Sequence, residues 1–131
     1  MDDLKTSSPN ATYVAHCRRG ELAYQVDGSN GKSVFPPRVM APGSGSVDLS
    51  WRVSAGVGTV YATTAVANRG APAHNVALID MDEGFRLMSR VEGIDPLSVR
   101  IGMRVRVRMH PEEGDLPPYP VFVPVDAEAS A

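Results

Sequence analysis

The stretch NVALIDMDEGFRLMSRVEGIDPLSV, residues 75–99, decides the fold of this chain. It holds two apolar segments of strand length, and the short turn between them contains Gly84, so the pattern predicts a β-hairpin. After the second segment, Asp95 and Pro96 form the start signal of a helix, with an aspartate at the N-cap and a proline at the first helical position. The sequence therefore predicts two strands followed by a single helical turn.

Further segments of strand character lie on both sides of this stretch at regular intervals. Together with the hairpin they make five principal strands, and the helical turn falls between the third and the fourth. This count and order are typical of an OB-fold barrel, whereas sandwich folds usually need more strands. We therefore expect an all-β fold built on a five-stranded OB-fold barrel. The predicted strands are residues 58–68, 75–81, 85–92, 103–109 and 119–125.

A smaller unit is expected before the barrel. The segment HCRRGELAYQ, residues 16–25, has the outline of one knuckle of a zinc ribbon, with a strand from about residue 12, a tight turn at Gly20 and a returning strand. The barrel would thus follow a small hairpin lobe. The predicted organisation is a disordered N-terminus over 1–11, a zinc-ribbon-like lobe over 12–50, an OB-fold over 51–125 and a disordered tail over 126–131.

The composition argues against several functional classes. The chain has 13 basic and 15 acidic residues, and its formal net charge of −2 gives no overall attraction for nucleic acid or an anionic membrane. Its single cysteine, Cys17, excludes an intramolecular disulfide. No apolar run approaches the roughly 20 residues that span a bilayer, and the N-terminus lacks a leader pattern. We therefore expect a cytoplasmic protein that binds neither nucleic acid nor membrane.

Four segments of the predicted barrel carry a resemblance to a known family. They are GTVYATTAV at 58–66, VALIDMDEGFRLMSRVEGIDP at 76–96, IGMRVRVRM at 101–109 and PVFVP at 120–124. In order and spacing they resemble the acyl-CoA-associated OB-fold family, formerly described as a domain of unknown function, whose members carry a rubredoxin-like zinc ribbon before a C-terminal OB-fold. The resemblance implies that this chain has the same two parts.

The resemblance also implies four metal-ligand positions, where family members have two C-x-x-C pairs. In this sequence they are Cys17, Gly20, Ala41 and Ser44. A structural zinc site needs four Cys or His donors, so a single thiol predicts a degenerate ribbon without metal. Apolar contacts with the barrel or with a partner chain must then hold the lobe. The candidates for a partner interface are Tyr24, Phe35, Val39, Met40, Tyr119 and Phe122.

A basic stripe is the other candidate site. In MRVRVRM, residues 103–109, alternation places Arg104, Arg106 and Arg108 on one face of a strand. They could bind the phosphates of coenzyme A or of a nucleic acid, or they could be an outer barrel face paired with carboxylates. We favour the second interpretation, because any half-buried strand shows this alternation. We expect no cofactor on the chain alone, and a CoA thioester only where it is shared with a partner.

No catalytic set of residues is recognisable, and the resemblance implies an accessory role beside larger enzymes that process acyl-CoA. We therefore expect a non-catalytic scaffold subunit in a hetero-oligomer. Its catalytic residues would lie on a thiolase-like or ketosynthase-like acyltransferase subunit, including those that acylate small aromatic polyketides. Two alternatives are an accessory subunit of a MaoC-like hydratase or retro-aldolase, and an OB-fold that binds single-stranded nucleic acid. The aromatic content of 6% and the negative charge weigh against the last.

Overall fold

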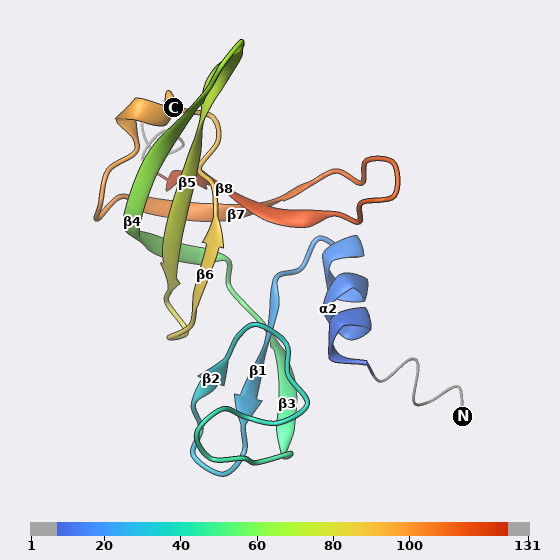
Figure 1. The fold of residues 1–131 in the computed structure, drawn as a ribbon. Coiled ribbons are helices and arrows are strands. Elements are labelled where there is room, and N and C mark those ends of the chain that lie inside the picture. Colours follow the sequence, from blue (N-terminus) through green and yellow to red (C-terminus); the bar gives the residue numbers. More distant parts are fainter. Residues whose placement is uncertain (1–7, 126–131) are drawn as a thin grey trace.

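The structure is a computed structural model that describes residues 8–125 (Figure 1). The disorder predicted for 1–7 and 126–131 therefore lies outside the described residues. Strands dominate the described part and form two antiparallel sheets, so the predicted all-β class is confirmed. No helix within residues 8–125 is long and apolar enough to cross a membrane.

Five strands form the larger sheet, in the order β6-β5-β4-β7-β8, with every neighbouring pair antiparallel. The sheet curls into an OB-type barrel, and a parallel bridge between Val91 and Phe122 joins its two ends. A short 3-10 turn, η1 (Pro96–Ser98), follows β6, and the Asp95 carboxylate caps it by accepting a hydrogen bond from the Leu97 N–H. The strands are β4 (Val57–Asn68), β5 (Ala71–Met81), β6 (Arg86–Ser89), β7 (Arg104–His110) and β8 (Tyr119–Pro124).

The smaller sheet lies below the barrel in Figure 1 and has the order β2-β1-β3. Its strands are β1 (Ala23–Asp27), β2 (Ser33–Val34) and β3 (Leu49–Val53). β3 pairs with β1 along its whole length. The predicted boundary at residue 51 falls within β3, which pairs in the small sheet, and the strands of the large sheet begin with β4. We call α2 and this sheet, residues 9–53, the N-terminal lobe.

The first described element is a helix, which corrects the strand predicted to run from residue 12 into Cys17. The helix α2 (Pro9–Arg18) has a proline in its first turn, and it ends before Gly20, whose φ of +79° suits the left-handed turn that follows. Residues 9–11, predicted to be disordered, begin this helix. The loose alternation of the sequence is also compatible with a helix, because Tyr13 and Cys17 are four residues apart and share one helix face.

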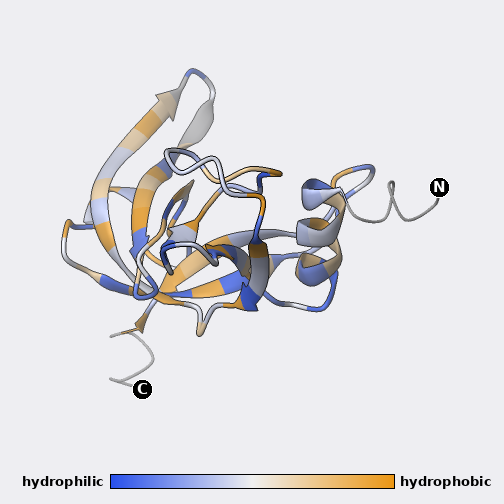
Figure 2. Cartoon of the chain, turned by 90° about the horizontal axis from the view of Figure 1, so that it is seen from below, coloured by the Kyte–Doolittle hydropathy of each residue, from blue (hydrophilic) through white to orange (hydrophobic). Residues whose placement is uncertain are grey.

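The N-terminal lobe and the barrel share one hydrophobic core. Leu22 of the lobe belongs to it and is 1% exposed. Figure 2 shows hydrophobic residues recurring along the strands, as the alternation of buried and exposed positions requires. The barrel contributes Val60, Ile79, Val105 and Phe122, each at most 1% exposed.

Three aromatic rings fasten the lobe to the barrel. Phe85, directly before β6, stacks on Tyr24 of β1 with ring centroids 4.8 Å apart. On its other side it stacks on Phe35, which follows β2, at 5.1 Å. Phe85 and Tyr24 are buried, so this aromatic cluster is part of the shared core. Apolar contact within the chain therefore holds the lobe in place.

Candidate functional site

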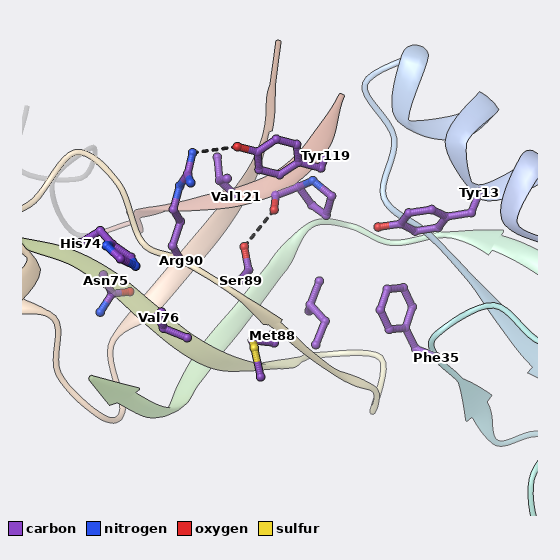
Figure 3. Close-up of a pocket in the computed structure, with 12 residues that line it drawn as sticks. Tyr13, Phe35, His74, Asn75, Val76, Met88, Ser89, Arg90, Tyr119 and Val121 are labelled. Carbon is purple, nitrogen blue, oxygen red and sulfur yellow. Dashed lines mark hydrogen bonds between the residues drawn. The ribbon is translucent and has the colours of Figure 1, made fainter. Parts of the chain in front are cut away.

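A cavity of about 410 Å³ lies where the edge of the barrel meets the N-terminal lobe (Figure 3). The edge strand β6 and the first residues of β8 form two of its walls. Tyr13 of α2 and Phe35 reach it from the lobe. Most of the lining is apolar, with Leu87, Met88 and Val121 among the residues that surround it. We call this cavity the seam, because it separates the two edge strands of the barrel.

The seam exists because a proline interrupts the closure of the barrel. Both backbone groups of Phe122 in β8 pair with the segment that follows β6. The Phe122 N–H donates to the Arg90 carbonyl at 3.0 Å, and the Phe122 carbonyl accepts from the Glu92 N–H at 2.7 Å. Two residues earlier stands Pro120, which has no N–H to continue this ladder. Its carbonyl instead accepts a hydrogen bond from the Ser89 hydroxyl at 2.8 Å. β6 and β8 therefore do not pair on the N-terminal side of Ser89.

Arg90 stands at the polar end of the seam and is held by its neighbours. Its guanidinium donates to the Tyr119 hydroxyl at 3.0 Å and to the Glu92 carboxylate at 2.6 Å. Arg108 donates to the same carboxylate. Partial burial acts to raise the pKa of Glu92, but the hydrogen bonds from the two arginines outweigh it and hold this pKa below its ordinary value. The network thus fixes the direction of Arg90.

Asn75 lines the cavity beside Arg90, and both polar ends of its side chain are hydrogen-bonded. It is 3% exposed. Its amide nitrogen donates to the Thr63 hydroxyl at 2.8 Å and to the Thr64 carbonyl at 3.1 Å, while its oxygen accepts from the Val91 N–H at 2.9 Å. This one side chain therefore ties β4 and β5 to the segment that closes the barrel.

The lobe end of the seam is closed by Tyr13 and Phe35, whose rings meet edge to face at 5.7 Å. Burial raises the pKa of the Tyr13 hydroxyl, and the nearby Cys17 thiol acts in the same direction. Burial also raises the pKa of the Cys17 thiol, and the residue is 2% exposed. A buried, protonated thiol is a poor nucleophile, so Cys17 acts here as a small core residue.

The predicted ligand positions do not form one cluster. Each of two short turns is closed by a glycine N–H, from Gly31 to the Asp27 carbonyl at 2.7 Å and from Gly45 to the Ala41 carbonyl at 2.9 Å. A hydrogen bond of 2.6 Å from the Ser44 hydroxyl to the Asp27 carboxylate joins the two turns. The turn that contains Ala41 and Ser44 is therefore linked to residues 27–31, and the prediction that pairs it with Cys17 and Gly20 needs correction.

Asp27 is the centre of this link. Hydrogen bonds from Ser44 and then Ser29 lower the pKa of Asp27 to about 2. The residue is 2% exposed by surface area, and its other oxygen accepts from the Ser29 N–H at 2.8 Å. Within residues 8–125, no three His, Cys, Asp or Glu side chains gather where they could hold a metal ion. The sequence signal for this pair of turns is the shared spacing of DGSNG and APGSG, each with glycine in the fifth position.

The basic stripe is largely engaged in ion pairs. Arg104 makes two hydrogen bonds of 2.8 Å to the Asp82 carboxylate. Arg108 pairs with Glu92, as described above. The carboxylates beside these two arginines weaken the electrostatic attraction of the arginines for a phosphate. The two arginines are thus arranged as on an outer barrel face that is paired with carboxylates.

The six candidates for a partner interface fall into three pairs that differ in exposure. Tyr24 and Phe122 are 8% and 0% exposed, so a partner cannot reach them and these two assignments are corrected. Phe35 and Tyr119 are half-buried at the seam. The last two, Val39 and Met40, are 70% and 54% exposed on the lobe. Sequence reasoning did not find Ser89 or Arg90, because their contacts with β8 join residues 31 and 29 positions apart in the chain. It also missed Asn75, whose three partners lie 11 to 16 positions away.

The curled five-stranded sheet and its η1 turn define an OB-fold protein. Residues 51–110 match the family model described as ChsH2, C-terminal OB-fold domain. This match confirms the resemblance seen in the barrel segments.

Two curated relatives are subunits of hydratases. The 3-oxo-4,17-pregnadiene-20-carboxyl-CoA hydratase alpha subunit of Mycobacterium tuberculosis is 37% identical over 65 residues, which are 47% of this chain and 21% of that protein. A probable enoyl-CoA hydratase alpha subunit of Thermomonospora curvata is 34% identical over 93 residues, 68% of this chain and 29% of that protein. The chain therefore spans less than a third of the length of these relatives.

Two solved structures share the fold. A chain of the Ltp2-ChsH2(DUF35) aldolase superposes with a TM-score of 0.77 at 29% identity, covering 88% of this chain and 94% of that one. A DUF35-family protein of unknown function from Sulfolobus solfataricus gives a TM-score of 0.61 at 15% identity, covering 81% and 86%. The second likeness shows the fold alone.

Proposed function

We propose that this chain is an accessory subunit that binds and positions an enzyme acting on acyl-CoA, without supplying catalytic residues of its own. The observation that carries the proposal is the match of residues 51–110 to the ChsH2 OB-fold family, together with the likeness to a chain of an aldolase assembly. The names of the relatives refer to acyl-CoA hydratase subunits. An acyl-CoA enzyme is therefore the partner class that the comparisons support.

The chemistry of the seam supports a binding role. Its polar side chains are engaged in bonds that stabilise the fold, since Ser89 holds Pro120 and Arg90 holds Tyr119. A general base or nucleophile needs a hydrogen-bonding group directed at substrate, with a second group that orients it. The seam offers an apolar wall instead, and that suits binding better than proton transfer.

Three partner classes remain within the proposal. A thiolase-like or ketosynthase-like acyltransferase is the partner that the family resemblance first implies. The names of the relatives add weight to a hydratase or an aldolase. We propose a hetero-oligomer in each case, with any CoA thioester shared between this chain and the catalytic subunit.

Co-purification tests the proposal. The tagged full-length chain is expressed at its native level, and the proteins that elute with it in a fixed ratio are identified by mass spectrometry. We expect a hydratase, aldolase or thiolase-like subunit, whose turnover of acyl-CoA rises when this chain is added. Turnover of acyl-CoA by the purified single chain would contradict the accessory role, as would its recovery as a monomer without such a subunit.

A further inference from the structure

The free edge of β6 offers unpaired backbone groups to the seam. In the hairpin of β5 and β6, the Met81 N–H donates to the Phe85 carbonyl at 2.8 Å, so odd-numbered residues of β6 bond to β5 and even-numbered ones face the other way. Arg90 and Glu92 obey this alternation, because both bond to Phe122 on the far side. The N–H and carbonyl of Met88 must therefore point toward the seam.

In the described part of the chain, the N–H and carbonyl of Met88 have no recorded hydrogen-bond partner. Within residues 8–125, no backbone hydrogen bond reaches Met88 from the side of β8. The residue of β8 that stands in line to supply one is Pro120, which lacks the N–H that the Met88 carbonyl would need. An exposed strand edge of this kind is a template for another strand. Natural proteins cover such edges or use them for binding.

We propose that an extended segment of the catalytic partner subunit enters the seam and adds to the edge of β6 at Met88 as a further strand. This inference rests on the proposed function, because the partner is the acyl-CoA enzyme named there. A peptide fits the seam better than a hydrocarbon chain, because a peptide backbone supplies both a donor and an acceptor to Met88 and a hydrocarbon supplies neither.

The side walls of the seam favour apolar side chains on the incoming segment. Phe35 and Leu87 line the inner side, and Val121 lines the side of β8. Side chains of a strand alternate between two faces, so every second residue of the partner segment would pack against these groups. The other residues would lie beside the Met88 side chain, which is 71% exposed on the outer face of the sheet.

Hydrogen exchange on the intact complex tests this docking mode. The free chain and the complex with the co-purified enzyme subunit are compared for exchange at the amides of residues 86–90. We expect the Met88 amide to exchange about tenfold more slowly, or slower still, in the complex. An unchanged rate at Met88 in a complex that forms normally would overturn the inference and leave the proposed function standing.

The variant Pro120→Val provides a second measurement. Its new N–H stands in line with the Met88 carbonyl, so β8 can pair with β6 and close the seam. Affinity for the enzyme subunit should then fall about tenfold or more, while the isolated chain becomes more resistant to urea. The matched control is Pro117→Val, which adds an N–H in the loop before β8, outside the lining of the seam. Equal binding by the two variants would refute the docking mode.

The same measurements identify other occupants. Protection of Met88 that grows with the concentration of the chain alone would assign the seam to a second copy, against the inference. Slower exchange of the Met88 amide in the presence of coenzyme A alone would assign the seam to the amide-bearing arm of the cofactor, and this result would also contradict the inference. Failure of the tagged chain to recover any acyl-CoA enzyme would refute the proposed function itself, and with it the partner named here.

Discussion

Replacement of Phe85 by alanine should loosen the N-terminal lobe from the barrel. The ring of Phe85 lies between Tyr24 and Phe35, at centroid distances of 4.8 and 5.1 Å, and the residue is 5% exposed. Both neighbours come from the lobe, whereas Phe85 comes from the barrel. Removal of the ring leaves a cavity at the centre of the junction, and neither lobe strand can move in to fill it without losing its register with its neighbour.

The expected loss is large for one substitution. Truncation of a buried phenylalanine to alanine costs about 3–5 kcal/mol of unfolding free energy, and the two stacked pairs place Phe85 in the upper part of this range. For a chain of this size, such a loss lowers the melting temperature by roughly 10–20 °C. Because the two parts share one core, wild-type protein should unfold in a single transition.

Urea unfolding followed by circular dichroism and by Trp51 fluorescence measures both quantities. Trp51 lies on β3 and reports on the lobe, while circular dichroism reports on the whole chain. The control is Leu97→Ala, an 80% exposed position where the change should stay within about 0.5 kcal/mol. A loss below about 1 kcal/mol for Phe85→Ala would refute the role of the aromatic cluster. Two separate transitions in wild-type protein would refute the shared core.

Three further predictions concern single side chains. In Asp27→Asn the link between the two turns is weakened. Because the folded-state pKa of Asp27 is about 2, below the ordinary aspartate value near 4, its stabilisation is present above about pH 4 and is lost as the pH falls toward 2. The urea midpoint of the variant should therefore lie below wild type at pH 6, and the gap should narrow at pH 2.5; a constant gap would contradict the pKa. In Asn75→Ala the Val91 N–H loses its acceptor, so unfolding free energy should fall by about 1–3 kcal/mol, and a loss no greater than that of Leu97→Ala would refute the role of Asn75. Cys17 should resist alkylation by iodoacetamide in native protein and react fully in urea, whereas rapid native labelling would show an accessible thiol.

The barrel could be predicted from the sequence because its signals are local. Apolar residues alternate along each strand, Gly84 marks the hairpin turn, and Asp95 with Pro96 marks the helical turn between strands. Each signal needs only a few neighbouring residues. The order of the strands then follows from the small number of topologies that such a series allows.

The sequence analysis wrongly predicts a strand where the lobe begins with the helix α2, because the helix signals in this segment are weak. Residues 9–18 contain several residue types of low helix propensity, and Tyr13 and Cys17 suit a strand as well as a helix. What decides between them is tertiary packing, since Tyr13 contacts Phe35 and Cys17 is buried. The proline at position 9 and the glycine at position 20 were the available signals.

The seam could not be predicted from signals in neighbouring residues, and the reason is a different one. Its opening depends on Pro120 occupying the position whose N–H would meet the Met88 carbonyl, and this register is set by the hydrogen bonds of Phe122 to Arg90 and Glu92. A proline near the end of the chain indicates an edge strand, but it does not say which strand it leaves unpaired. Only the closed barrel brings the two segments together.

The way in which the lobe is held limits where a partner can bind. The lobe has a two-residue strand, β2, and its buried side chains Leu22 and Tyr24 belong to the core that it shares with the barrel. Tyr24 and Leu22 are therefore already buried within the chain and contribute nothing further to an interface. The exposed apolar residues of the lobe are confined to its loops and to the end of β3, with Val39, Met40 and Val47 between 54% and 71% exposed. On the lobe, a partner can therefore gain apolar contact area only at these exposed positions and at the seam, and the unpaired backbone at Met88 makes the seam the part that specifies the geometry.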